Sequence, residues 1–135
     1  MVGFFQGIAG TVGHELVHYK EWYNKAMGSL PYMLNLYTHF GDEHVLGHHK
    51  YIATDEDPVS AGLNESVYYA IAKAVVGTQY KTYERANQKL ARQNGNQYPG
   101  VLRQLFGNKM IWYTGLHISI LAGVYKLFGM KGFLF

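Results

Sequence analysis

The stretch HFGDEHVLGHH, residues 39–49, contains four histidines, and the last three, His44, His48 and His49, have the spacing H-x-x-x-H-H. On an α-helix, His44 and His48 lie on one face, and His49 is rotated from His48 by roughly 100°. Three imidazoles with this spacing can reach two adjacent metal ions from one short helix. The stretch therefore predicts a helix that holds metal.

A second histidine pair lies upstream in HELVH, residues 14–18, where His14 and His18 are again four residues apart. This spacing puts both imidazoles on one helical face, as two ligands of one metal require. Neutral imidazole suits Zn, Fe, Cu or Ni, but a Zn site takes only three or four protein ligands. Five well-spaced histidines therefore favour two metal ions. The neighbouring Glu15 and Glu43 either orient imidazole N–H groups or are solvated surface carboxylates.

Two further histidines and an acidic loop are less informative. His39 can be a ligand, a residue that orients a ligand, or a packed side chain, and its position in the sequence does not decide among these. His117 lies alone in an apolar stretch, so we expect it to pack and not to bind metal. Asp55, Glu56 and Asp57 are expected to be solvated loop residues, with binding of a partner as the alternative.

The composition indicates contact with a membrane. Hydrophobic residues make up 48% of the chain and charged residues 16%, against about 25% charged in soluble domains. The aromatic content of 16% suits a membrane interface. The mean hydropathy of −0.14 is too low for a chain made mostly of spans, so we expect one or two spans beside a polar portion. The absence of cysteine excludes disulfides and thiolate metal sites.

We expect an all-α, membrane-associated chain that forms a single partial domain over residues 1–135. Its parts are the histidine boxes at 13–50, an amphipathic basic region at 64–109 and a membrane span at 110–128. Helices are expected at 2–25, 28–49 and 67–91, with Pro31 in the first turn of the second. Four glycines on one face of the first helix would let another helix approach closely: Gly3, Gly7, Gly10 and Gly13.

The region from residue 81 to residue 109 is strongly basic. It holds six basic residues against one acid, Glu84: Lys81, Arg85, Lys89, Arg92, Arg103 and Lys109. It lacks the interleaved aromatic residues of a surface that stacks nucleic-acid bases, so no nucleic-acid partner is expected. The charge favours lipid headgroups or an acidic protein partner.

The motifs taken together resemble one known family. HELVHYK at 14–20 is similar to the first box of the integral-membrane alkane hydroxylases (alkane 1-monooxygenases), which lie within the membrane fatty acid desaturase and hydroxylase superfamily. EHVLGHH at 43–49 is similar to their second box, and ATDEDPVSA at 53–61 to the run that follows it. The resemblance covers nearly the whole chain and implies a part of a multi-span helical bundle. The H-x-x-x-H-H spacing favours hydroxylation over desaturation.

This resemblance implies that five histidines bind two non-haem Fe ions: His14, His18, His44, His48 and His49. It also implies hydroxylation of an aliphatic chain, alkane or fatty acyl, with O2 and with electrons from a rubredoxin- or ferredoxin-type donor. Lys81, Arg85 and Lys89 would serve as the docking surface for that donor or for membrane lipid. The family's later boxes, similar to H-S-D-H-H and N-Y-x-E-H-Y-G, do not occur in this sequence. We therefore expect the remaining ligands to come from another chain or a missing segment.

Two other functions remain open. The chain can be a catalytically retired structural subunit of a larger membrane complex, with its metals lost. It can also be a membrane zinc protease of the H-E-x-x-H type, with His14 and His18 on zinc and Glu15 as the general base. The intact histidine boxes favour an enzyme over a retired subunit.

Overall fold

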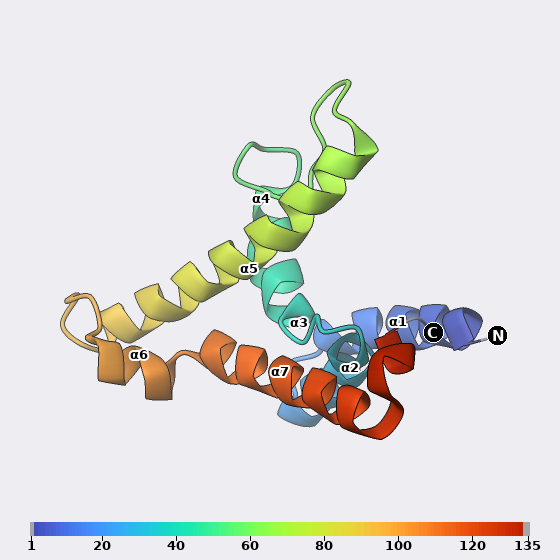
Figure 1. Ribbon diagram of the computed structural model, residues 1–135. Coiled ribbons are helices and arrows are strands. Elements are labelled where there is room, and N and C mark those ends of the chain that lie inside the picture. The colour runs from blue at the N-terminus through green and yellow to red at the C-terminus, as the bar shows by residue number, and fades with distance from the viewer. Residues whose placement is uncertain (1, 134–135) are drawn as a thin grey trace.

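A computed structural model describes residues 2–133, and in these residues all regular structure is helical, as predicted. Figure 1 shows two long helices, α5 and α7, as arms that meet beside α6, with α3 between them. The α-helices are α1 (Val2–Val17), α2 (Trp22–Leu34), α3 (Phe40–Glu43), α4 (His49–Tyr51), α5 (Val67–Arg92), α6 (Val101–Gly107) and α7 (Lys109–Phe128). A π-helix, η1 (His44–His48), joins α3 to α4, and a 3-10 helix, η2 (Gly129–Phe133), follows α7.

Helices α1 and α2 pack closely where two glycines meet. A Cβ added at Gly13 would lie 2.7 Å from the carbonyl oxygen of Gly28, so neither position has room for a side chain. The Tyr32 hydroxyl donates a hydrogen bond of 2.8 Å to the Gly10 carbonyl across the same interface. The expected glycine face therefore serves helix packing at Gly13, whereas open space surrounds the Cβ positions of the three earlier glycines, Gly3, Gly7 and Gly10.

The first two predicted helices have wrong boundaries. The helix expected over 2–25 ends at Val17, where a turn over 18–21 reverses the chain into α2. The helix expected over 28–49 is interrupted after Leu34, because Leu36 takes a positive φ of 56° that no α-helix accommodates. Pro31 consequently lies in the last turn of α2 and not in the first turn of a helix.

Helix α5 matches the predicted helix over 67–91 to within one residue. A buried pair of asparagines fastens it to the start of α7: Asn108 Nδ2 donates to Asn87 Oδ1 at 2.8 Å. Asn108 Oδ1 also accepts from the Met110 N–H at 2.9 Å and so caps α7. One side chain thus sets both the start of α7 and its contact with α5.

The predicted span over 110–128 coincides with α7, but its assignment as a span is not supported. Among residues 2–133, no helix combines the length and the apolar character needed to cross a membrane. His117 and Lys126 lie within α7 and lower its hydropathy.

Candidate metal centre

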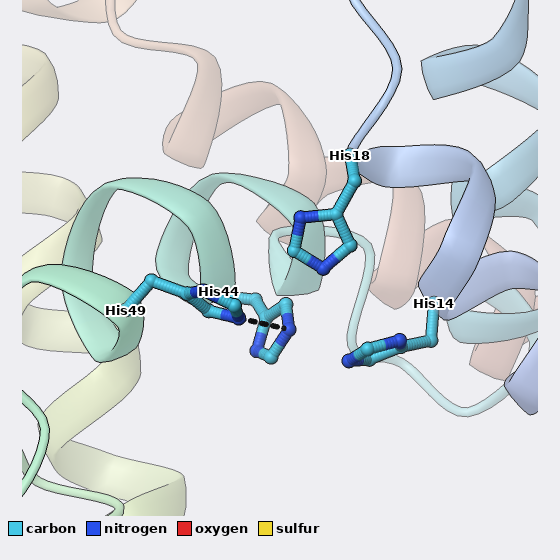
Figure 2. A group of neighbouring side chains, drawn as sticks. All are labelled: His14, His18, His44 and His49. Carbon is cyan, nitrogen blue, oxygen red and sulfur yellow. Dashed lines mark hydrogen bonds between the residues drawn. The ribbon is translucent and has the colours of Figure 1, made fainter.

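Four histidines from separate helical segments converge in one place. His14 lies in the last turn of α1 and His18 directly after it, while His44 begins η1 and His49 begins α4. Figure 2 shows the rings of the first pair directed at those of the second. One ring nitrogen from each residue lies within 4.8 Å of all the others. The tertiary structure therefore joins the two boxes that lie apart in the sequence.

The π-helix decides which histidine of the second box joins this cluster. Its backbone hydrogen bonds span five residues, and His44 and His49, five residues apart, lie with their Nε2 atoms 2.9 Å from each other. His48 stacks on His44 with a ring separation of 5.6 Å, but it is not among the four histidines whose nitrogens converge. An α-helix had been expected to pair His44 with His48. The wider π-turn brings His49 to His44 instead.

Gly47 allows η1 to approach α5. A Cβ at this position would lie 2.3 Å from Nη2 of Arg85, so the guanidinium rests directly on the glycine backbone. Nη2 of Arg85 lies 3.6 Å from Oε1 of Glu43, whose side chain is 3% exposed. Burial raises the pKa of Glu43, and the charge of Arg85 opposes this rise. Glu43 is thus the partner of Arg85, and no hydrogen bond among the described residues joins it to a histidine.

This ion pair bears on the predicted docking surface. Arg85 contacts Glu43 and Gly47 and is only partly exposed, so it does not belong to a free basic surface. On the same helix, Lys89 is exposed and Lys81 is half-buried. Only these two lysines of the three expected docking residues remain candidates.

Aromatic rings cover one side of the cluster. Phe40 stacks on His44 with a ring separation of 4.8 Å, and Tyr32 stacks on the other face of Phe40 at 3.9 Å. No role in the site was assigned to these two residues from the sequence. The signal for Phe40 is its place four positions before His44, one helical turn away. The stack fixes the His44 ring and shields it from water on that side.

The cluster keeps imidazole neutral. Burial, followed by the proximity of four other imidazoles beginning with that of His14, lowers the pKa of His44 to about 4. The pKa of His49 is also lowered, by loss of solvent and by the neighbouring histidines. Neutral imidazoles have a free lone pair for a metal.

His14 has an orienting partner as well, because its Nδ1 lies 3.2 Å from Oε1 of the exposed Glu15.

His48 has a partner that was not predicted. Its Nδ1 donates a 2.8 Å hydrogen bond to Oδ2 of Asp57, whose side chain has no exposed surface. Asp55 and Glu56 are exposed, as expected of the acidic loop, but for Asp57 that expectation was wrong. Burial alone would raise the pKa of Asp57, but hydrogen bonds, the first from Ser60, outweigh burial and hold it below its usual value.

The other two histidines lie outside the cluster. His39 is fully buried, and its Nε2 lies 3.4 Å from the Thr78 hydroxyl. His117 is hydrogen-bonded through Nε2 to the Thr38 hydroxyl at 2.8 Å. His39 therefore occupies a packed position, one of the three possibilities that its sequence context left open, and His117 packs as expected.

The donor set fits a transition metal. Four imidazoles from two chain segments lie together, and the two with lowered pKa values, His44 and His49, face each other through their Nε2 atoms. Imidazole is a good ligand for Fe, Cu, Zn and Ni. The zinc protease interpretation uses only His14 and His18 as ligands, and it does not explain why His44 and His49 converge on them.

Histidines that converge from two H-x-x-x-H segments on a helical scaffold define a polyhistidine site. The family model for fatty acid desaturases matches residues 1–135, and the chain belongs to this family. It is similar to alkane 1-monooxygenases, with 28% identity to that of Ectopseudomonas oleovorans over 99% of this chain and 32% of the relative. Identity is 31% to alkane 1-monooxygenase 1 of Pseudomonas aeruginosa, over 99% of this chain and 34% of the relative. Identity is 34% to the alkane 1-monooxygenase of Acinetobacter baylyi, over 95% of this chain and 30% of the relative.

These matches confirm the resemblance that the histidine boxes indicated. The chain spans about a third of the length of the curated relatives it matches. No solved structure gives a significant match.

Proposed function

We propose that this chain forms part of the iron centre of a membrane monooxygenase that hydroxylates an aliphatic chain, an alkane or a fatty acyl chain. One observation carries the proposal: the two histidine boxes converge, so that His14, His18, His44 and His49 offer nitrogens within 4.8 Å of one another. Similarity to alkane 1-monooxygenases supports the reaction class. The overall reaction consumes the C–H substrate, O2, two electrons and two protons, and it yields the alcohol and water.

The residues of this chain would hold and orient the metal ions. His14, His18, His44 and His49 hold iron, and His48 is the fifth proposed ligand. Iron, when bound, supplies the redox chemistry that activates O2. The Tyr32–Phe40 stack keeps water from one side of His44. The lowered pKa of His44, about 4, keeps its lone pair available at neutral pH.

The centre needs groups from outside this chain. Two iron ions require more ligands than five histidines provide, so the remaining ligands would come from another chain or from a further segment. An electron-transfer protein of the rubredoxin or ferredoxin type would supply the two electrons. The aliphatic substrate and the many exposed apolar side chains, such as Phe4, Phe5 and Ile8, suit a protein held in or on a membrane.

Metal content and molecular mass, measured together on membrane-extracted material that contains this chain, test the proposal. We expect about two iron ions and either a larger polypeptide or a co-purified histidine-rich chain. His44→Ala and His48→Ala should each lower the bound iron, because each removes a proposed ligand. His117→Ala is the matched control and should leave iron unchanged, because His117 binds Thr38.

Other results would support the competing functions. One zinc per chain and no iron would indicate the protease. A chain without metal, held at fixed stoichiometry in a large complex, would indicate a retired structural subunit. Equal iron retention in His44→Ala, His48→Ala and His117→Ala would overturn the ligand assignment.

A further inference from the structure

We propose that Asp57 is a positioning residue of the metal centre, which holds His48 in the tautomer that leaves Nε2 free to bind metal. This inference rests on the proposed function, since it assigns a role to His48 as a ligand. It goes beyond that function because it gives the acidic loop, otherwise a surface feature, a part in building the site.

The hydrogen bond itself fixes the tautomer. An ionised carboxylate only accepts hydrogen bonds, so the proton shared between Nδ1 of His48 and Oδ2 of Asp57, 2.8 Å apart, belongs to the imidazole. A neutral imidazole with its proton on Nδ1 has its lone pair on Nε2. Carboxylates that accept from the second nitrogen of a metal-binding histidine fix its ring and raise its basicity.

Asp57 is itself held rigidly. Its Oδ2 also accepts from the Ser60 hydroxyl at 2.6 Å, and its Oδ1 accepts from the Val59 N–H at 3.1 Å. The side chain has no exposed surface, so water does not compete for these oxygens. A carboxylate with this many fixed donors is directed at His48 and is not a solvated surface charge.

The loop that carries Asp57 is clamped onto α5. Lys73 donates to the Ser60 carbonyl at 2.9 Å and also to the Glu65 carboxylate at 2.8 Å. Pro58 packs against Gly77, where an added Cβ would lie 2.4 Å from the proline Cβ. Because these contacts hold the loop against α5, the Asp57 carboxylate has a defined position next to His48.

The first test reads the tautomer without any metal. In the full chain with 15N-labelled histidine, the shifts of His48, assigned through a His48→Gln variant, should report a proton on Nδ1. Asp57→Ala should shift His48 towards the Nε2–H form, whereas Asp55→Ala, which removes an exposed neighbour, should not. An unchanged His48 tautomer in Asp57→Ala would overturn the inference.

The second test reads metal binding with Fe(II) alone, and with Co(II) alone as a spectroscopic probe. Asp57→Asn should weaken binding by about 10- to 100-fold and alter the Co(II) visible spectrum. Lys73→Met loosens the clamp but keeps the Asp57–His48 bond, so it should weaken binding far less. Equal losses in both variants would show that the loop acts only as scaffold and would overturn the role of Asp57.

His44→Ala separates this inference from the proposed function. If His44→Ala weakens Fe(II) binding while Asp57→Asn and His48→Ala do not, the metal centre stands and the role of Asp57 is overturned. If the wild-type chain and all variants bind neither Fe(II) nor Co(II), the proposed function fails, and the role of Asp57 fails with it.

Discussion

At the scale of single residues, the chain keeps several histidines neutral, and His39 is the most buried of them. Its side chain has no exposed surface, and its Nδ1 has no hydrogen-bond partner. Burial, followed by the proximity of His117, lowers its pKa to about 4, although Asp42 opposes the shift. A proton added at Nδ1 of His39 would therefore be buried without a hydrogen-bond partner.

We predict that His39 makes the free energy of unfolding depend on pH. Its pKa in the folded chain, about 4, lies below the unfolded value of about 6.5, so the unfolded state binds more protons between these values. The contribution of His39 to the free energy of unfolding is fully present above pH ~6.5. It is lost as the pH falls towards 4, and the total loss is about 3 kcal/mol. Chemical denaturation of wild type and of His39→Gln at several pH values measures this.

His39→Gln keeps a polar side chain but cannot titrate, so its stability should fall less steeply over this pH range. Asp55→Asn is the control, because it removes an exposed titratable side chain of the acidic loop. Parallel pH profiles of wild type and His39→Gln would contradict the prediction.

At the scale of elements, the contact between η1 and α5 depends on the ion pair of the buried Glu43 with the partly exposed Arg85. The contact is possible because Gly47 has no side chain in the path of the guanidinium. Oε1 of Glu43 and Nη1 of Arg85 have no hydrogen-bond partner, so the pair is held mainly by charge. Loss of the Arg85 charge alone leaves the Glu43 carboxylate buried without a cation.

We predict that Arg85→Met destabilises the chain by about 3 kcal/mol at neutral pH, because it leaves the Glu43 carboxylate buried without a cation. The double variant Glu43→Gln/Arg85→Met removes both charges and should be more stable than Arg85→Met alone. Equilibrium unfolding of the two variants and the wild type measures the difference. A double variant that is no more stable than Arg85→Met would show that the charge of Glu43 is unimportant.

At the scale of the whole molecule, the basic residues on α5 that remain docking candidates can affect how fast a partner protein associates. With Arg85 paired internally, the predicted docking surface reduces to Lys81 and Lys89 on α5. Charges at the rim of an interface act mainly on the association rate, and salt screens them. Docking of an acidic electron carrier therefore stays a prediction for these two lysines.

We predict that Lys81→Ala/Lys89→Ala lowers the rate of reduction by a rubredoxin-type donor by roughly three- to tenfold at low salt. The difference from wild type should shrink as the salt concentration rises. Stopped-flow reduction of the metal-loaded membrane protein measures both effects. The matched control is Lys20→Ala/Lys25→Ala, which removes two exposed lysines, one just before α2 and one within it. Equal low-salt rates in all three proteins would count against docking at α5.

The sequence by itself determined the family of this protein and the residue types at its candidate metal centre. The spacing of His14 and His18 was sufficient to predict that their imidazoles lie together, because an α-helix has a fixed angle per residue and His18 directly follows α1. The two boxes also predicted the family that the whole chain matches, and the hydrophobic pattern predicted α5 almost to the residue. These features are local, so they can be inferred from neighbours in the chain.

Only the tertiary structure decided which side chains meet. The π-turn pairs His44 with His49, and not with His48, because backbone hydrogen bonding changes there. Asp57 is buried against His48, and Arg85 against Glu43, because the loop after α4 and the helix α5 pack onto η1. Such contacts depend on how separate segments fill space together, and the physical reason they escape sequence analysis is that no local spacing encodes the packing between helices.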